Sequence, residues 1–385
     1  MSFVVIFLLC CTSYMVRCDN LENNYSLDLI QVLFRHGERT PIDCESRMLQ
    51  AVSNASSYDP WGYGELTNRG MMQEYEIGQM LRRTYDRFLP KLYRPEHVYA
   101  HSSGTSRTKN SLALVLAALF PPAAELRWNE HLNWMPINIF TDPRPLDVLN
   151  KPRDCVKFKK YLDDLINSTE LKPMVAEHEE VTNIVGNIYG QKFDLGDLFC
   201  IYNALFIQKN LKLNLPQWYN DDIYAKLQRA TKFHFETLSY NSDLKRLNGG
   251  TFVRRMLENI RKSLNESNRR KIYLYSSHDK NLHAFARAHD LDLAELPDYG
   301  SAIVLEKYSD DFDKHYVKLS MWSGFPKKLR TLKLKNCEEM CPLDEYTKLI
   351  DPVLPSDEEM MCLFQNLEPR DIQRILTTDT SAIDS

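Results

Sequence analysis

Two arginines flank a histidine in the short segment Arg35-His36-Gly37-Glu38-Arg39. A guanidinium presents a planar fork of N–H donors that fits two oxygens of a phosphate at once. A neutral imidazole carries a lone pair and titrates near neutrality, so it can act as a nucleophile toward phosphorus. Nearby arginines disfavour the imidazolium and keep the ring neutral at mildly acidic pH. The segment therefore predicts a phosphate site with His36 as nucleophile, and the alternative is a charged surface loop.

Two further groups of residues could complete such a site. His278 and Asp279 adjoin each other, and a positive histidine can bind a phosphoryl oxygen while a carboxylic acid protonates a leaving oxygen. Arg107 stands at the start of a predicted helix, where backbone N–H groups also favour an anion. Taken singly, each group is more often an ordinary surface feature. Whether these groups indicate a phosphate site therefore depends on their positions in the fold.

Each group follows a short apolar segment that is typical of a buried strand. Residues 27–34 precede Arg35, residues 97–100 lie upstream of Arg107, and residues 271–275 lie upstream of His278. Helical patterns follow over residues 67–88, 107–119 and 281–288, with Thr67 near the first cap and Pro90 as a stop, and two more strands are predicted at 301–308 and 316–322. Repetition of strand, loop and helix predicts an α/β fold with a mostly parallel sheet flanked by helices. Ligands bind outside the carboxyl ends of such strands, so the three groups are expected to converge.

Residues 142–248 differ in composition, being rich in charge and in helix formers. We expect them to form a mainly helical insertion, or cap, in an α/β core made of residues 19–141 and 249–376. Residues 377–385 are polar and are predicted to be a flexible tail. Residues 1–18 are typical of a secretory signal peptide, because the apolar run at 3–11 is too short to span a bilayer and small residues precede Asp19; the alternative is a buried N-terminal segment.

Cysteine usage and glycosylation motifs agree with export. Nine cysteines are present, and six remain after the predicted signal peptide: Cys44, Cys155, Cys200, Cys337, Cys341 and Cys362. An even number in an exported chain favours disulfides, and Cys337 and Cys341 are near enough to close a small loop. No Cys or His cluster with metal-site spacing is present, so no metal is expected. Four sequons predict glycosylation at Asn24, Asn54, Asn167 and Asn265.

Overall charge excludes some partners. The formal net charge is −4, so there is no global basic field for nucleic acid or for an anionic membrane. No stretch after the predicted signal peptide is apolar enough for a transmembrane anchor. Affinity for an anionic group must therefore come from individual arginines. The absence of an obviously basic surface argues mildly against highly phosphorylated substrates.

The segment Arg35-His36-Gly37-Glu38-Arg39-Thr40-Pro41 resembles the RHGxRxP signature of the histidine acid phosphatases, the second branch of the phosphoglycerate-mutase-like superfamily. The resemblance covers nearly the whole mature chain and is greatest with the secreted venom and salivary acid phosphatases of insects. It continues through Glu65-Leu66-Thr67-Asn68-Arg69-Gly70, Ser106-Arg107-Thr108, Leu119-Phe120-Pro121-Pro122, Trp128-Asn129-Glu130, His278-Asp279 and Cys337-Glu338-Glu339-Met340-Cys341-Pro342.

This resemblance implies a role for each candidate residue. His36 would carry a phosphohistidine, and Asp279 would protonate the leaving alcohol and then help to activate water. Four residues would hold the phosphate oxygens without a metal or other cofactor: Arg35, Arg39, Arg107 and His278. It also implies the disulfides Cys155–Cys362 and Cys337–Cys341, whereas the pairing of Cys44 and Cys200 stays open. The expected enzyme is a secreted acid phosphatase for small phosphomonoesters, with a lysosomal location as the alternative. A homodimer is compatible with the sequence, which does not determine the oligomeric state.

One part of the predicted site departs from the family pattern. Ser106 stands where the family usually has an acidic residue, and the loop at residues 101–105 also differs. Both changes predict weaker support for Arg107 and lower activity. One alternative function is therefore a secreted phosphatase-like binding protein with weakened catalysis, although an inactive descendant would be expected to lose His36 or an arginine. A mutase or a phytase-like enzyme is the other alternative, and the sequence does not identify the leaving alcohol.

Overall fold

The computed structural model describes residues 25–50, 52–265, 267–324 and 327–362. The predicted signal peptide at 1–18, the sequon asparagine Asn24 and the predicted tail at 377–385 lie outside the described residues. The other three sequon asparagines, Asn54, Asn167 and Asn265, are exposed.

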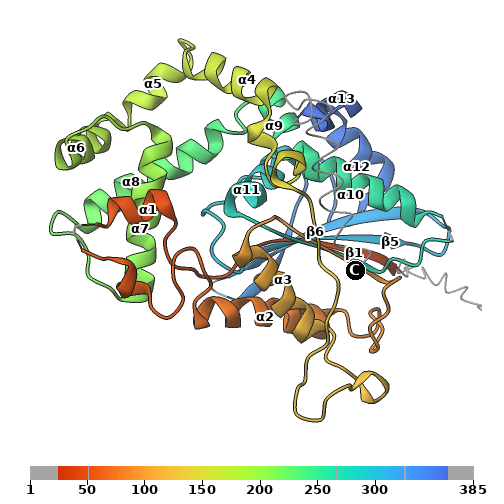
Figure 1. The fold of residues 1–385 in the computed structure, drawn as a ribbon. Coiled ribbons are helices and arrows are strands. Elements are labelled where there is room, and N and C mark those ends of the chain that lie inside the picture. Colours follow the sequence, from red (N-terminus) through yellow and green to blue (C-terminus); the bar gives the residue numbers. More distant parts are fainter. Residues whose placement is uncertain (1–24, 51, 266, 325–326, 363–385) are drawn as a thin grey trace, which may run out of the picture.

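A single mixed sheet runs through the centre of the α/β core (Figure 1). Its order is β3-β2-β4-β1-β5-β6-β7, with β8 paired to β6. The pairs β3–β2, β2–β4 and β4–β1 are parallel, and the remaining pairs are antiparallel, so five of the eight described strands run in one direction. This confirms the predicted α/β class. The strands are β1 (Ser26–Arg35), β2 (Val98–Ser102), β3 (Phe140–Thr141), β4 (Ile272–Ser277), β5 (Ala302–Ser309), β6 (His315–Ser323), β7 (Lys328–Leu332) and β8 (Cys341–Pro342).

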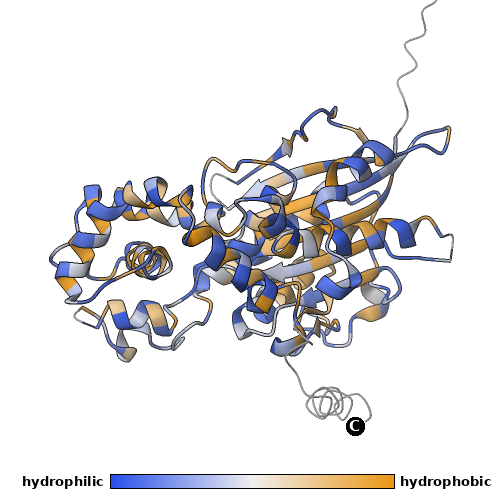
Figure 2. Cartoon of the chain, turned by 90° about the horizontal axis from the view of Figure 1, so that it is seen from above, coloured by the Kyte–Doolittle hydropathy of each residue, from blue (hydrophilic) through white to orange (hydrophobic). Residues whose placement is uncertain are grey.

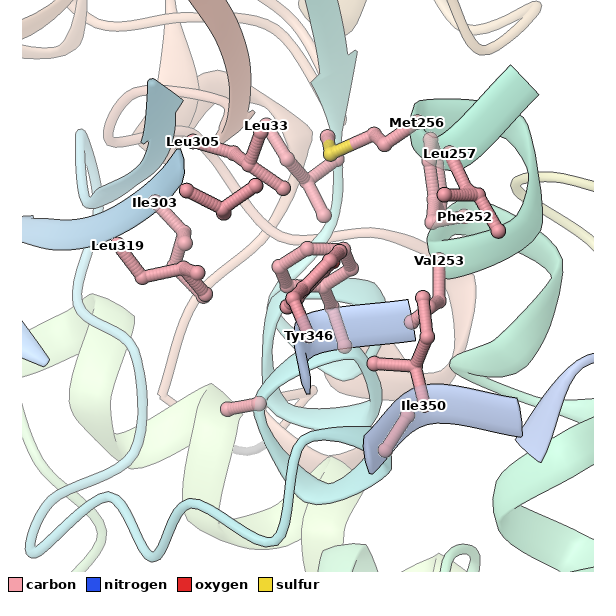
Figure 3. Packing of buried hydrophobic residues seen from close by; sticks show 14 of the residues in the cluster. Leu33, Phe252, Val253, Met256, Leu257, Ile303, Leu305, Leu319, Tyr346 and Ile350 are labelled. Atoms are coloured by element: carbon pink, nitrogen blue, oxygen red, sulfur yellow. The ribbon is translucent and has the colours of Figure 1, made fainter. Parts of the chain in front are cut away.

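Helices cover both faces of the sheet. The apolar side chains of β1 alternate between the two hydrophobic cores that lie between the sheet and these helices. Ile30, Val32 and Phe34 pack with α2 (Asn68–Thr84) and α3 (Ser106–Leu119). Leu29 and Leu33 face the opposite core, which contains residues of α10 (Gly250–Ser263), α11 (Asp279–Ala288) and α12 (Leu343–Ile350) (Figure 3). Apolar residues accordingly concentrate along the sheet and the helix faces turned to it (Figure 2). Strands buried on both faces in this way are typical of parallel sheets.

The predicted element boundaries are correct to within a few residues, with one larger difference at α2. Thr67 caps this helix as predicted, because its hydroxyl accepts from the Gly70 N–H at 3.0 Å. The helix ends at Thr84 rather than at residue 88. Beyond it, the Arg82 guanidinium donates to the carbonyls of Leu89 and Pro90 at 2.7 and 3.0 Å. These bonds give hydrogen-bond partners to carbonyl groups after the helix, so the helix can end before Pro90.

The segment at residues 142–248 contains six α-helices, and five of them, α4–α8, extend to one side of the sheet (Figure 1). They are α4 (Val156–Ile166), α5 (Leu171–Ala176), α6 (Glu179–Tyr189), α7 (Leu195–Leu211) and α8 (Asp221–Thr237); α9 (Ser242–Leu247) lies against α10. The early helix α1 (Asp43–Met48) packs on α7, so we call α1 and α4–α8 together the cap. The short helices are η1 (Ala55–Tyr58), η2 (Ala124–Leu126), η3 (Arg144–Leu146), η4 (Pro152–Asp154), η5 (Asp351–Val353) and α13 (Asp357–Met360).

Three disulfides pair all six predicted mature cysteines. Cys155–Cys362 and Cys337–Cys341 are the pairs that the family resemblance implied. Cys44–Cys200 resolves the pair that the sequence left open, and it joins α1 to α7. No helix among the described residues is both long and apolar enough to cross a bilayer.

Candidate active site

Three adjacent strand ends bring the predicted site residues together. Arg35 is the last residue of β1 and His36 follows it, while His278 and Asp279 follow β4 directly. Arg107 lies in the first turn of α3, just after β2. Because β4 lies between β1 and β2 and all three are parallel, their carboxyl ends open at the same edge of the sheet. The convergence expected from the sequence is therefore present.

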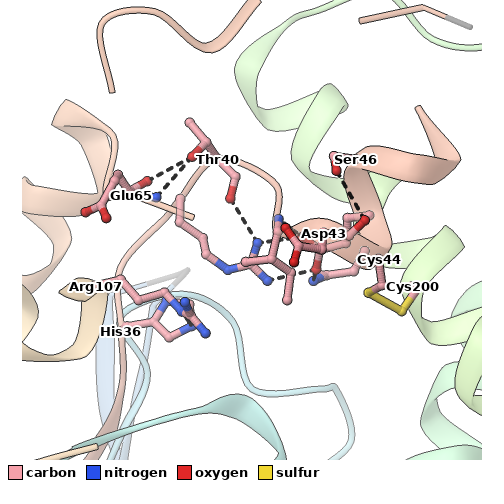
Figure 4. Close-up of polar contacts among 12 residues, drawn as sticks. His36, Thr40, Asp43, Cys44, Ser46, Glu65, Arg107 and Cys200 are labelled. Carbon is pink, nitrogen blue, oxygen red and sulfur yellow. Dashed lines mark hydrogen bonds and ion pairs between the residues drawn. A yellow bond between two sulfur atoms is a disulfide. The ribbon is translucent and has the colours of Figure 1, made fainter. Parts of the chain in front are cut away.

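His36 is buried and is held as a neutral ring with its lone pair on Nε2. Its Nδ1 lies 2.9 Å from the Gly37 carbonyl oxygen. A carbonyl oxygen only accepts hydrogen bonds, so Nδ1 carries the proton and Nε2 is the unprotonated atom. Arg107 Nε donates toward this Nε2 at 3.3 Å, and the guanidinium lies against the ring (Figure 4). Burial lowers the pKa of His36 well below its ordinary value, and the charge of Arg107 lowers it further. Nε2 is therefore available as a nucleophile at acidic pH.

Gly37 is required by close packing at this strand end. A Cβ at this position would lie 2.2 Å from the Gly70 carbonyl oxygen at the start of α2. No side chain fits that gap, so Gly37 lets the loop that carries His36 lie directly on the helix.

Arg39 is held by a glutamate that the sequence did not single out. Its two terminal nitrogens contact the Glu45 carboxylate at 2.6 and 2.8 Å in a bidentate pair. Glu45 also accepts from the side chain of Asn203 on α7 and from the backbone N–H of Ile42. Although burial acts against the charged form, Glu45 raises the pKa of Arg39 above its ordinary value. The fork that was predicted to grip phosphate is thus turned to Glu45, and Arg39 Nε is left buried without a hydrogen-bond partner among the described residues.

Arg35 is fixed in a similar way on the other side of His36. Its Nη1 donates to the Pro297 carbonyl at 2.7 Å, and its Nη2 lies 3.1 Å from Asp279 Oδ2. The guanidinium stacks 4.0 Å from the ring centroid of Tyr299. Its Nε, like that of Arg39, is buried and has no hydrogen-bond partner among the described residues. Both arginines therefore keep one unsatisfied N–H donor.

Asp279 lies at the first position of α11, with His278 as the N-cap. Burial alone would raise its pKa, but Arg35 and then Lys280 hold the pKa of Asp279 below its ordinary value. The Lys280 backbone N–H also donates to Oδ1 at 2.7 Å. The carboxyl is therefore ionised at mildly acidic pH unless another anion approaches it.

The loop at residues 101–105, which the sequence marked as a weak support, links α3 to His278. Ser103 Oγ shares a hydrogen bond of 3.0 Å with His278 Nε2 and one of 2.9 Å with Thr108 Oγ1. Ser106 Oγ donates to Glu65 Oε1 at 2.6 Å. Burial and then Arg107 lower the pKa of His278 well below its ordinary value, so the positive imidazolium suggested by the sequence is disfavoured.

A pocket of about 540 Å³ opens beside Arg35 and Asp279. Aromatic side chains of the cap form part of its wall, so the pocket lies between the candidate site residues and the cap. Its aromatic lining residues are Phe199, Tyr202, Phe206 and Phe235. No group of three or more His, Cys, Asp or Glu side chains within the described residues is arranged to hold a metal ion.

The sequence missed the residues that orient the arginines: Glu45, Pro297 and Tyr299. Glu45 is separated from its second partner, Asn203, by 158 positions, and Pro297 from Arg35 by 262. No local pattern connects such pairs. The only sequence feature near Glu45 was the adjacent Cys44, whose partner was open.

Comparisons with known proteins agree with this geometry. The model of the histidine phosphatase superfamily (branch 2) matches residues 26–321. The venom acid phosphatase Acph-1 of Apis mellifera is 36% identical over 342 residues, which is 87% of each chain. Prostatic acid phosphatase of Bos taurus is 30% identical over 366 residues, covering 93% of each chain. The solved structure of the Hafnia alvei phytase superposes with a TM-score of 0.66 at 14% identity over 87% of this chain and 98% of that one, which shows a shared fold.

Proposed function

Because the chain belongs to branch 2 of the histidine phosphatase superfamily, we propose that it is a secreted acid phosphatase that hydrolyses small phosphate monoesters through a phosphohistidine on His36. One observation carries this proposal. The lone pair of a buried neutral His36 lies among three arginines, two of which keep a buried Nε–H without a partner. Unsatisfied buried donors are rare and costly in proteins. A phosphoryl group in front of His36 would satisfy them.

In the first step, His36 Nε2 attacks phosphorus and forms the N–P bond while the ester P–O bond breaks. The leaving oxygen takes the proton of Asp279, which ends the step as a carboxylate. Charge on the phosphoryl oxygens is stabilised by Arg35, Arg39 and Arg107 from fixed positions, which is the main contribution of protein groups to phosphoryl transfer. His278 completes this ring of phosphate ligands.

In the second step, water attacks the phosphohistidine and gives a proton to Asp279. The N–P bond breaks, inorganic phosphate is released, and His36 and the Asp279 carboxyl group return to their initial forms. The requirement that Asp279 begins each cycle protonated favours acidic pH, since Arg35 lowers the pKa of this carboxyl in the free enzyme.

The cap is proposed to select the leaving group. Residues 142–248 supply α7 and α8, whose side chains Phe199 and Phe235 line the pocket beside Asp279. An alcohol that receives its proton from Asp279 would extend into this pocket. The aromatic wall favours alcohols that present an aryl or alkyl group to it.

Secretion is supported by the predicted signal peptide, by three disulfides and by similarity to a venom protein. A lysosomal destination is the alternative. The proposed partners are small phosphomonoesters, and a homodimer is compatible with the proposal.

A direct test compares the wild type with His36→Ala on an aryl phosphate at about pH 5. We expect the variant to lose nearly all turnover, because no other side chain replaces Nε2, whereas His131→Ala, which alters an exposed histidine, keeps it. Acid quench of the wild type should trap phosphate on His36. Full turnover by His36→Ala would overturn the phosphohistidine mechanism.

The alternative of a phosphatase-like binding protein predicts a different outcome. Such a protein would bind phosphate but turn over no ester.

For the proposed phosphatase, turnover is expected to be retained in the presence of a chelator, because arginines carry the charge stabilisation. Loss of turnover with the chelator would contradict the metal-free mechanism.

A further inference from the structure

Three basic side chains near His278 and Asp279 make no ion pair with the described residues. Lys280 follows Asp279 in α11, whereas Arg153 belongs to η4 and Lys151 is its N-cap. Two of them form side-chain hydrogen bonds to neutral groups, Arg153 to Asn248 at 2.9 Å and Lys280 to His234 at 3.3 Å. All three are partly buried. Partly buried cations without a carboxylate partner are unusual, because desolvation of the charge is left uncompensated.

The Lys280 ammonium is held against the aromatic wall of the cap. Its Nζ lies 4.2 Å from the ring centroid of Phe199 and 5.5 Å from that of Phe235. Burial lowers the pKa of His234 to about 3, so this ring is neutral and accepts one N–H of the ammonium. Burial and then Arg153 lower the pKa of Lys280 to about 8, so the ammonium is charged at acidic pH. It keeps two further N–H donors.

Arg153 and Lys151 act on the same corner of the site. Their positive charges both contribute to lowering the pKa of His278, and they also act on Lys280. We call Lys151, Arg153 and Lys280 the basic corner. Lys151 and Arg153 thus act on His278, and Lys280 acts on the neighbouring Asp279.

Acidic groups close to the basic corner already have partners of their own. Asp154 pairs with Arg144 at 3.7 Å, and Asp279 pairs with Arg35 at 3.1 Å. Asp147 accepts from the Asn150 side chain at 2.9 Å. These carboxylates and Asp194 favour the charged forms of the three cations from a distance, but none of them forms an ion pair with Lys151, Arg153 or Lys280.

The catalytic phosphate does not account for these charges. Its proposed ligands lie around His36 at the ends of β1, β2 and β4, and they are Arg35, Arg39, Arg107 and His278. Lys280 of the basic corner instead packs against Phe199 and Phe235, which line the leaving-group pocket together with Asp279. This lysine therefore adjoins the pocket that the departing alcohol is proposed to occupy.

We propose that the basic corner is a second anion subsite that binds a carboxylate or a second phosphate carried by the leaving group. This inference rests on the proposed phosphatase function and specifies its substrate class: phosphomonoesters whose alcohol bears a further negative charge. An anion on Lys280 and Arg153 compensates their desolvation and aligns the ester oxygen with Asp279. The net charge of −4 hides this local site, since only three cations make it.

A matched set of aryl phosphates tests the subsite. The 3- and 4-carboxyphenyl phosphates are compared with the corresponding carboxamides, which have the same size and no charge, and with 1,3- and 1,4-phenylene bisphosphate. At one ring position we expect kcat/KM for the charged ester to exceed that of the amide by about tenfold to 100-fold, mostly through KM. The carboxylates and bisphosphates distinguish the two sources of the anion.

Variants assign the effect to individual side chains. Lys280→Met should bring the ratio of charged to neutral ester toward one, Lys280→Arg should restore part of it, and Lys151→Met should lower it. Lys209→Met is the control, because this cap lysine also rests on an aromatic ring, 4.3 Å from the centroid of Tyr224, but forms an ion pair with Asp221. A wild-type ratio near one at both ring positions, or a high ratio that survives in both Lys280→Met and Lys151→Met, would overturn the subsite.

Binding measurements separate this inference from the proposed function. Calorimetry with 4-carboxybenzyl phosphonate and its amide requires no turnover. If the wild type prefers the charged phosphonate and Lys280→Met abolishes that preference, the subsite is supported even when no ester is hydrolysed. Absence of ester hydrolysis would instead overturn the phosphatase proposal. Equal binding of both phosphonates by the wild type contradicts the subsite.

Discussion

In the proposed mechanism His36 begins the reaction unprotonated and Asp279 begins it protonated, and their surroundings favour only the first of these two states. Burial and three arginines keep His36 neutral at mildly acidic pH. Arg35 and Lys280 favour the ionised form of Asp279, which must be protonated to act as an acid. A bound phosphate dianion would oppose that ionisation, because like charges within a few ångströms raise a carboxyl pKa. Substrate binding and low pH thus act together on Asp279.

Asp279→Asn separates this role from phosphate binding. We expect turnover of an alkyl phosphate, a poor leaving group, to fall by about 10²- to 10⁴-fold, and turnover of a nitrophenyl phosphate to fall much less. In the wild type, kcat/KM for the alkyl ester should rise as pH falls from 6 to 4, because the protonated fraction of Asp279 grows as pH approaches its lowered pKa. The pH series is measured for both esters, and equal losses on the two would contradict the proton-donor role.

Glu45 shows how a side chain without contact to phosphate can determine its binding. Replacement by Gln keeps the shape but removes the charge opposite Arg39, which is then buried without a counter-ion. We expect KM for an aryl phosphate to rise about tenfold and the free energy of unfolding to fall by on the order of 3 kcal/mol. Steady-state kinetics and denaturant unfolding measure the two effects. Glu179→Gln, at an exposed position of the cap, serves as control, and an unchanged KM in Glu45→Gln would show that Arg39 does not depend on this pair.

Element positions explain why distant residues cooperate. Strands β1 and β4 pair through Arg35 and Ser277, and β4 pairs with β2 through Ser276 and Ser102, so three loops leave the sheet side by side. The cap reaches the same place through α1, which lies between Arg39 and α7. The orientation of Arg39 therefore depends on where α7 lies relative to the core.

Removal of the Cys44–Cys200 disulfide tests this coupling between α1 and α7. The loop that it closes spans 156 residues, and the chain-entropy model assigns it about 5 kcal/mol, against about 2 kcal/mol for the short Cys337–Cys341 loop. We expect Cys44→Ser/Cys200→Ser to lower the midpoint of thermal unfolding and to raise KM, because Glu45 and Asn203 lose their common anchor. Cys337→Ser/Cys341→Ser should leave KM unchanged. Equal effects of the two double variants would argue against a link from this disulfide to Arg39.

The whole molecule buries several histidines in neutral form. Burial lowers the pKa of His283 and His289 to about 4 and that of His234 to about 3, and it lowers those of His36 and His278 well below the ordinary value. His289 shows how the neutral form is satisfied: its Nδ1 donates to the Phe285 carbonyl at 2.8 Å, and its Nε2 accepts from the Tyr346 hydroxyl at 3.0 Å. Unfolding exposes these rings, which then take up protons below pH 6.5.

Stability should therefore rise from pH 5 to pH 7. The unfolded state binds more protons than the folded state in this range, so each such histidine contributes about 2 kcal/mol to the difference. Glu74 acts in the opposite direction, because burial raises its pKa well above the ordinary value and the folded state keeps its proton as pH rises. Denaturant unfolding in phosphate-free buffer at both pH values measures the balance.

Two variants check the sign of each contribution. His289→Gln should reduce the gain in stability between pH 5 and pH 7, whereas Glu74→Gln should increase it. The exposed His131→Gln is the control and should leave the gain as in the wild type. A larger gain in His289→Gln would contradict the assignment.

The sequence by itself was enough to predict the fold class, the strand ends and the six candidate site residues near them. Those features are local: an apolar run predicts a buried strand, and a loop after it carries the polar residues. The disulfide pairs Cys155–Cys362 and Cys337–Cys341 also followed from the family resemblance and are present.

Only the tertiary structure decided how those residues are used. It turned the fork of Arg39 to Glu45, paired Arg35 with Asp279, and brought Lys280 against Phe199. Each of these contacts joins side chains that meet only because whole helices and strands pack together. The partner then changes the protonation or the available hydrogen-bond donors of Arg39, Arg35 or Lys280. A local pattern can name the groups that meet a phosphate, but their orientation and protonation are set by neighbours that are distant in the chain.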